Sequence, residues 1–197
     1  MNARLLFMLL VPFSVLYAGV IWVRNKAYDY SLFSAEEVIV PVVSVGNLSV
    51  GGTGKTPVVD WLIKTFQQSG KRVAVVSRGY GGSYTDAVGV VGDERGLQME
   101  AHDSGDEPCL LAMRNPEAII LVARKRILGV RRAIREYGAD IVILDDGFQH
   151  RSVARNLDLV LLDANRPFGS GWVLPAGNLR ELPGSLSRAD MILLTRS

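Results

Sequence analysis

The stretch that decides the fold of this 197-residue chain is Gly46-Asn47-Leu48-Ser49-Val50-Gly51-Gly52-Thr53-Gly54-Lys55-Thr56-Pro57. It follows an apolar run over Val38–Val45 and precedes a helical pattern over Pro57–Ser69. A glycine-rich turn between a strand and a helix is the context of a phosphate-binding loop, because glycines let backbone N–H groups turn onto phosphate oxygens. The stretch therefore predicts a nucleotide-binding α/β domain.

Two residues at the end of this loop carry its chemistry. Lys55 would reach the β and γ phosphates of ATP, and the hydroxyl of Thr56 would ligate Mg²⁺. Ser49 stands where the usual pattern has glycine, and a glycine-rich turn without a ligand is the alternative interpretation. The residues predicted to bind the nucleotide are Ser49, Val50, Gly51, Gly52, Thr53, Gly54, Lys55 and Thr56.

Continuous apolar runs elsewhere in the chain predict further strands. They cover Ala118–Val122, Ile141–Leu144, Leu159–Leu162 and Met191–Leu194, and a β-branched run over Arg72–Ser77 predicts one more strand. Continuous rather than alternating runs are typical of strands covered on both faces. Helical patterns over Glu107–Arg114 and Arg124–Tyr137 fit between them. We predict an α/β fold of the P-loop NTPase type, with a mainly parallel sheet, helices on both faces and a hydrophobic helix in front.

That hydrophobic segment is Leu5–Val23, 19 residues without a charge, bracketed by Arg4 on one side and by Arg24 and Lys26 on the other. Its length is close to what crosses a hydrocarbon core of about 30 Å. A spanning helix, an interfacial helix and a cleavable signal peptide stay open, and the last is disfavoured because it would export the phosphate loop away from ATP. We expect residues 1–27 to form a membrane-associated helix and residues 28–197 to form the nucleotide-binding domain.

Composition narrows the possible partners. The 22 basic and 20 acidic residues leave a net charge of +2, which gives no reason to expect nucleic acid. Cys109 is the only cysteine, and His102 and His150 are the only histidines, so neither an intrachain disulfide nor a Cys/His zinc site can form. A reducing cytoplasm fits best, and no obligate protein partner is evident.

Two acids end one of the predicted strands. Asp145 and Asp146 follow the apolar run Ile141–Leu144 directly. In a parallel sheet this places them at the carboxyl edge, where the phosphate loop also lies, and a carboxylate there can hold Mg²⁺. The alternative interpretation is a solvated strand end or a helix cap.

Five segments together resemble a known family. Asp145-Asp146-Gly147-Phe148-Gln149-His150 is similar to a signature of the tetraacyldisaccharide 4′-kinases of lipid A biosynthesis, and Gly46–Pro57 is similar to another. The remaining three are Ser77-Arg78-Gly79-Tyr80-Gly81, Gly105-Asp106-Glu107-Pro108 and Leu174-Pro175-Ala176-Gly177-Asn178-Leu179-Arg180-Glu181. They occur in the family's order and cover essentially the whole chain.

The resemblance implies transfer of the γ-phosphoryl group of ATP, with Mg²⁺, to the 4′-hydroxyl of an acylated disaccharide 1-phosphate lipid. The reaction would take place at the cytoplasmic face of the bacterial inner membrane, so the membrane surface is an implied partner. The implied catalytic residues are Asp106, which would accept the hydroxyl proton, Lys55, Arg78, Asp146 and His150. The implied metal ligands are Thr56, Asp145, Asp146 and Glu181. The implied substrate contacts are Arg126, Arg180 and Asn178.

Several of these residues have structural alternatives. Asp106 would equally serve as the N-cap of the helix Glu107–Arg114, and Glu181 as a surface charge. The arginines would form exposed ion pairs, above all Arg126, and His150 would be a structural histidine. The basic helix Arg124–Tyr137 would lie against anionic head groups or the substrate 1-phosphate, or simply face water.

The chain also departs from the family pattern. Ser170 stands where the family usually has asparagine, and Asn178 where it commonly has proline. The family continues into a C-terminal domain whose histidine assists the catalytic aspartate, and that domain is absent here. We therefore expect nucleotide binding with weak or absent turnover. The alternatives are a non-catalytic, membrane-anchored nucleotide-binding fragment and another P-loop NTPase, although the Asn-Lys-x-Asp segment of GTPases does not occur in the sequence.

Overall fold

The computed structural model describes residues 3–196, which form two compact units. The larger unit comprises residues 35–46 and 55–158, and the smaller comprises residues 3–34, 47–54 and 159–196. The phosphate loop and the hydrophobic helix therefore belong to the same unit as the last 38 described residues, 159–196. The predicted division of the chain after residue 27 stays a prediction.

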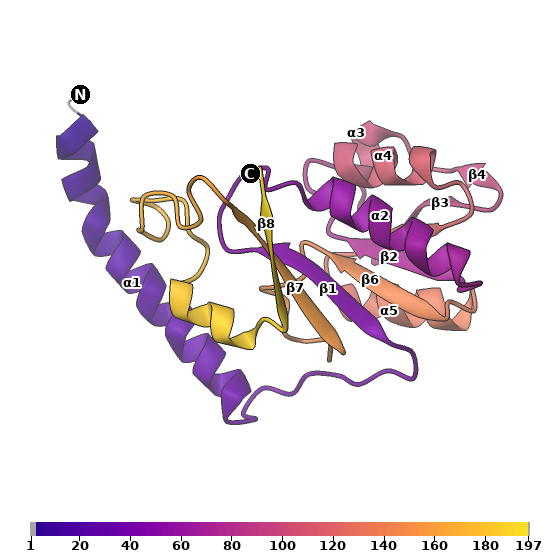
Figure 1. Ribbon diagram of the computed structural model, residues 1–197, viewed down its shortest axis with the longest axis horizontal. Coiled ribbons are helices and arrows are strands. Elements are labelled where there is room, and N and C mark those ends of the chain that lie inside the picture. Colours follow the sequence, from indigo (N-terminus) through magenta and orange to yellow (C-terminus); the bar gives the residue numbers. More distant parts are fainter. Residues whose placement is uncertain (1–2, 197) are drawn as a thin grey trace. The chain divides into compact units, whose positions relative to one another are not determined.

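The larger unit is built on a mainly parallel sheet (Figure 1). Along it the strand order is β4-β3-β5-β2-β6-β1. Strands β1, β6, β2 and β5 pair in parallel, and β3 pairs antiparallel with β5 and β4. The bounds are β1 Val42–Asn47, β2 Val73–Ser77, β3 Gly89–Asp93, β4 Gly96–Leu97, β5 Ile119–Val122 and β6 Ile141–Asp145.

Helices cover both faces of this sheet, as predicted. Figure 1 shows α5 (Arg126–Arg135) on one face and α2 (Lys55–Gln68) with α4 (Asp106–Arg114) on the other. A short helix, α3 (Ala101–Ser104), precedes α4. Every residue of β1, β2, β5 and β6 is buried, because successive side chains of a strand point to opposite faces and both faces are covered.

The smaller unit contains α1 (Ala3–Asp29), β7 (Leu157–Asp163) from Leu159 on, the 3₁₀ helix η1 (Pro183–Arg188) and β8 (Met191–Thr195). Strand β7 pairs in parallel with β8. The apolar side chains of β8 are exposed, from 38% at Leu193 to 59% at Leu194. Strand β8 is therefore not covered on both faces within residues 3–196.

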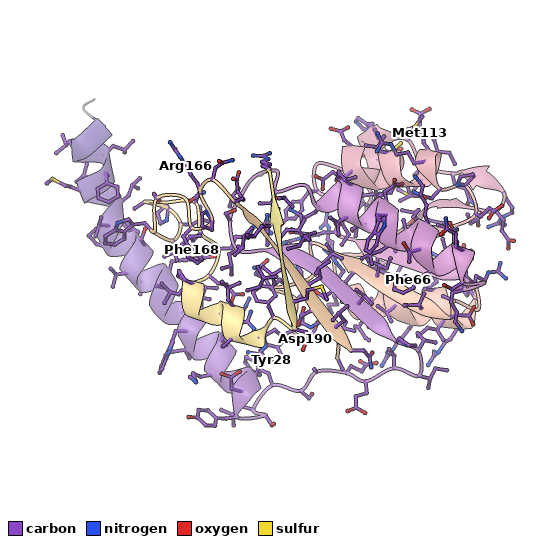
Figure 2. All side chains as sticks on the ribbon, viewed as in Figure 1. Tyr28, Phe66, Met113, Arg166, Phe168 and Asp190 are labelled. Atoms are coloured by element: carbon purple, nitrogen blue, oxygen red, sulfur yellow. The ribbon has the colours of Figure 1, made fainter. Side chains whose placement is uncertain are left out.

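Helix α1 is long and apolar, and most of its side chains are exposed (Figure 2). The segment Leu5–Asp29 has a mean hydropathy of 2.3 and is long and apolar enough to cross a membrane. Ser14 is the exception on this helix, because it is completely buried.

Some boundaries differ from the sequence prediction for identifiable reasons. Strand β1 begins at Val42 rather than Val38, because Pro41 has no N–H to give to a ladder. Helix α2 begins at Lys55, so that Pro57 lies within its first turn, where an N–H has no helical partner. Strands β3 and β4 were not predicted, since two of the five residues of β3 are glycine and β4 has only two residues.

Gly129 sets how closely α5 lies against the sheet. A Cβ atom there would lie 2.6 Å from a Val76 methyl carbon in β2 and 3.1 Å from the Cβ atom of Ala123. Both neighbours are fully buried, and valine is stiff, so neither has room to move. The close packing of helix on strand therefore depends on the missing side chain.

We predict that Gly129→Ala lowers the free energy of unfolding by ~1–3 kcal/mol, because overpacking outweighs the gain of about 1 kcal/mol in helix propensity. Urea denaturation measures the effect. The matched control is Gly184→Ala, because a Cβ atom there would meet nothing within 4 Å. A Gly129→Ala protein as stable as the wild type would contradict the packing described.

Candidate functional site

A buried ion pair lies at the carboxyl end of the sheet in the larger unit. The Lys55 Nζ atom is 3.4 Å from Oδ1 of Asp146, and the two side chains are only 8% and 9% exposed. The parallel register of β1 with β6 pairs Val45 with Asp145, so β6 ends in Asp145, with Asp146 next, where β1 also ends. The sequence prediction that the lysine and the two acids meet at one end of the sheet is confirmed as a placement.

The turn that carries Asp146 is shaped by glycines. Asp146 has φ 54°, a left-handed conformation that aspartate tolerates better than most residues. A Cβ atom at Gly46 would lie 2.6 Å from the Cβ atom and 2.7 Å from the backbone N of Phe148, and one at Gly147 would lie 2.8 Å from the Cβ atom of Leu144. The acid pair thus sits on a turn that packs backbone to backbone against the end of β1.

Asp145 is fully enclosed and holds its proton more tightly than an ordinary aspartate. Its carboxylate accepts a hydrogen bond of 2.9 Å from the Ser77 hydroxyl at the end of β2. Burial, followed by the negative charge of Glu107, raises the pKa of Asp145 to about 6, against the lowering effects of Ser77 and Lys55. A nearby cation would favour the ionised carboxylate.

Arg126 is the buried arginine of this site. It is 1% exposed, donates from Nη1 to the Ala123 carbonyl oxygen at 2.7 Å, and directs Nη2 toward the Asp145 carbonyl oxygen at 3.5 Å. Burial lowers the pKa of Arg126 to about 10, against the raising effect of Asp145 and Asp146, so it stays charged at neutral pH. The alternative of an exposed ion pair is therefore wrong for this residue.

Asp106 and Arg78 lie on neighbouring segments of the same unit. Asp106 is the exposed first residue of α4, and Gly105 holds the N-cap position, so the N-cap alternative for Asp106 is wrong. Gly105 has φ 89°, and a Cβ atom there would collide with the Tyr80 carbonyl oxygen. Arg78 donates to the Tyr80 hydroxyl at 2.6 Å and stacks over its ring. The start of α4 thus lies beside the loop that carries Arg78.

His150 ends the turn that begins with the acid pair. Its backbone N–H donates to the Gly147 carbonyl oxygen at 2.8 Å. Arg155 donates to the carbonyl oxygens of both Gly147 and His150, at 3.0 and 3.2 Å. Arg155 therefore holds this turn in place, a role that was not predicted.

In the smaller unit, the phosphate loop is braced by Asn47. This fully buried amide donates to the Thr53 hydroxyl at 2.9 Å and to the Gly51 carbonyl oxygen at 3.4 Å. Gly51 and Gly54 have φ 121° and 79°, so the loop depends on glycine at both positions. No role was predicted for Asn47, although its position directly after an apolar run and before the glycines is a signal for one.

The loop also borders an open pocket of about 410 Å³ within the smaller unit. Its walls include residues 49–53 and the loop after β7, where Arg166 and Phe168 are labelled in Figure 2. Asn178, a predicted substrate contact, lines the pocket as well. Its backbone carbonyl accepts a hydrogen bond of 2.7 Å from the Val50 N–H.

Glu181 lies in a buried cluster of charges. It is 0% exposed, and its oxygens accept from Arg24 at 3.3 Å and from Asn25 and Arg188 at 2.9 Å each. The alternative of a surface charge is therefore wrong. Its role as a metal ligand stays a prediction, and two arginines compete with a metal for the carboxylate.

The donor set limits what kind of metal site is possible. Among residues 3–196, no three His, Cys, Asp or Glu side chains gather closely enough to hold a metal ion. Asp145 and Asp146 nevertheless provide hard oxygen ligands. Mg²⁺ is commonly held by one or two carboxylates together with waters and substrate phosphates, so the residues fit a metal that arrives with a nucleotide.

Comparison with known proteins decides the family. The sequence profile described as Tetraacyldisaccharide-1-P 4′-kinase matches residues 6–197. The chain belongs to this family. Its resemblance to the tetraacyldisaccharide 4′-kinases, expected from the five segments, is thereby confirmed.

Individual relatives agree with this assignment. The tetraacyldisaccharide 4′-kinase of Syntrophotalea carbinolica is 55% identical over 98% of this chain and 54% of its own length. That of Chlorobaculum parvum is 46% identical over 100% of this chain and 55% of its own length. A crystal structure of LpxK from Aquifex aeolicus in complex with ATP has a TM-score of 0.90 at 39% identity, covering 97% of this chain and 59% of that one. The chain thus spans about half the length of the curated relatives it matches, and the predicted fold class is confirmed.

We predict that Asp145→Asn makes the protein more stable at about pH 8, by ~1–3 kcal/mol, with little difference near pH 4. Because the pKa of Asp145 is raised to about 6 in the folded protein, its contribution to stability is present below about pH 4 and is lost as the pH rises through 6. The asparagine has no charge to bury at any pH. Urea denaturation at several pH values tests this.

Asp93→Asn is the matched control, because hydrogen bonds from Arg95 lower the pKa of that buried aspartate. Its loss of stability should grow as the pH rises from about 3 to 5, the opposite direction. An Asp145→Asn protein that is less stable than the wild type by the same amount at every pH would contradict the account.

Proposed function

We propose that this chain is the ATP-binding part of a kinase that phosphorylates the 4′-hydroxyl of a tetraacylated disaccharide 1-phosphate lipid in lipid A biosynthesis. The observation that carries the proposal is the buried Lys55–Asp146 pair beside Asp145, directly after a glycine-rich loop in sequence. The names of the relatives and the ATP complex of the Aquifex aeolicus protein support it.

Nucleotide binding would begin with an exchange of partners at Lys55. The amine, now 3.4 Å from Asp146, would turn to oxygens of the β and γ phosphates, as lysines of such loops do. The backbone N–H groups of the preceding loop, residues 49–54, would bind the same phosphate chain. The Asp146 carboxylate would then bind a cation in place of the lysine amine.

Mg²⁺ is the cation that the residues would hold. Asp145, Asp146 and the Thr56 hydroxyl would ligate it directly or through water, and Glu181 remains a further predicted ligand. When bound, it would neutralise charge on the phosphate oxygens. The raised pKa of Asp145 fits this role, because burial disfavours the ionised carboxylate and a bound cation would favour it.

Phosphoryl transfer to a sugar hydroxyl requires a base. Asp106 would accept the hydroxyl proton, since it is exposed at the first position of α4 and does not serve as the N-cap of that helix. Arg78, on the adjacent loop, would offset charge on the moving phosphoryl group, and His150 would help to orient the site. Arg126, buried and charged, would hold the end of β6 near the phosphates.

The lipid acceptor would lie at a membrane. Helix α1 is apolar enough to enter one, and we propose the cytoplasmic face of the bacterial inner membrane as the location. Arg180 and Asn178 would contact the disaccharide 1-phosphate. The apolar helix would place the protein on the same membrane as its lipid acceptor, which would favour their encounter.

We predict that the chain binds Mg²⁺–ATP and that Lys55→Ala weakens binding at least about tenfold, because the loop loses its charged phosphate contact. Titration calorimetry in detergent measures it. Lys64→Ala is the matched control, since Lys64 lies on the same helix and pairs with Asp60 at the surface. Equal affinity in the Lys55→Ala and wild-type proteins would refute the proposed site.

Asp106→Asn should leave ATP affinity within about twofold of the wild type while removing any transfer of radiolabelled phosphate to a tetraacylated disaccharide 1-phosphate, because only the proton acceptor is lost. Asp103→Asn, a nearby exposed aspartate, is the control and should leave transfer unchanged. Undiminished transfer by the Asp106→Asn protein would remove this residue from the mechanism.

A further inference from the structure

Ser14 is out of place on an apolar, exposed helix. It is 0% exposed, whereas its neighbours Phe13 and Val15 are both 61% exposed. A helical serine commonly bonds back to the carbonyl four residues earlier. Here the hydroxyl instead donates to the Val173 carbonyl oxygen at 3.0 Å and accepts from the Ala176 N–H at 2.8 Å. Both capacities of one side chain are thus used on a single loop far along the sequence.

Other contacts run along the same side of α1. Phe7 packs edge to face on Trp172 at 5.7 Å, and the Tyr17 hydroxyl donates to the Arg180 carbonyl oxygen at 3.0 Å. Arg24 then pairs with the buried Glu181. The helix therefore holds the whole segment 172–181, with Ser14 as its fully enclosed contact.

That segment in turn holds the phosphate loop. The Val50 N–H donates to the Asn178 carbonyl oxygen at 2.7 Å, and the Arg180 N–H donates to the Leu48 carbonyl oxygen at 2.6 Å. Ser49 and Leu179 form an antiparallel bridge between these two bonds. The first half of the phosphate loop is thus fixed by a strand-like pairing with residues 178–180.

We infer that Ser14 is a positioning residue for nucleotide binding: its hydroxyl fixes the segment 173–180, which fixes residues 48–50 of the phosphate loop. The inference rests on the proposed function, because it concerns the affinity of the same ATP site. Helix α1 would then have two roles: it would hold the protein at a lipid surface, and it would set the shape of the phosphate loop. A buried hydroxyl in apolar surroundings suits this, because its hydrogen bonds are not replaced by water.

The test is Ser14→Ala in the full 197-residue chain, in detergent micelles, with hydrogen exchange and ATP titration on the same samples. Without the hydroxyl, the amides of Ala176, Val50 and Arg180 should exchange at least about tenfold faster, and ATP affinity should fall about threefold to tenfold. The buried strands β2 and β6 should keep wild-type exchange. Val15→Ala, the exposed neighbour on α1, is the control and should change neither readout.

Three results would overturn the inference. They are unchanged ATP affinity despite faster exchange at Val50, an equal loss of affinity in Val15→Ala, and faster exchange spread over β2 and β6, which marks general destabilisation. Failure of the proposed function looks different, because wild-type and Lys55→Ala proteins would then bind ATP equally poorly.

Discussion

The site depends on one buried ion pair, Lys55 with Asp146, held 3.4 Å apart. Two charges that are about 90% enclosed are costly to bury unless they are neutralised, so removing either residue alone is destabilising. The parallel pairing of β1 with β6 brings the pair together, and Gly46 and Gly147 let the acid turn approach the strand end. In the proposed function, nucleotide binding replaces this pair with contacts to phosphate and metal, so the pair serves binding rather than stability.

The sequence sufficed where the chemistry is local. A glycine-rich loop between a strand and a helix predicts the position of Lys55 at the carboxyl end of a parallel sheet. Two acids directly after an apolar run predict the same position for Asp145 and Asp146. The sequence did not predict the surroundings of residues whose contacts come from distant parts of the chain. Nothing near Glu181 in sequence reveals that Arg24, 157 residues earlier, encloses it, or that Arg126 is buried under the end of β6.

In the smaller unit, the apolar helix α1 carries a few polar side chains that bond to the rest of the unit. The segment 172–181 accepts hydrogen bonds from the side chains of Ser14, Tyr17 and Arg24. Such side chains are costly in an apolar phase unless they are satisfied, and here the protein itself satisfies them. The same bonds that allow α1 to carry polar groups therefore also order the segment that pairs with the phosphate loop.

The most direct test is a crystal structure of the chain with a non-hydrolysable ATP analogue and Mn²⁺, read through the anomalous signal of the metal. The account predicts a metal peak ~2.0–2.5 Å from a carboxylate oxygen of Asp145 or Asp146, with Lys55 turned from Asp146 to a phosphate oxygen. An ordered nucleotide bound elsewhere, with the Lys55–Asp146 pair still closed, would contradict it.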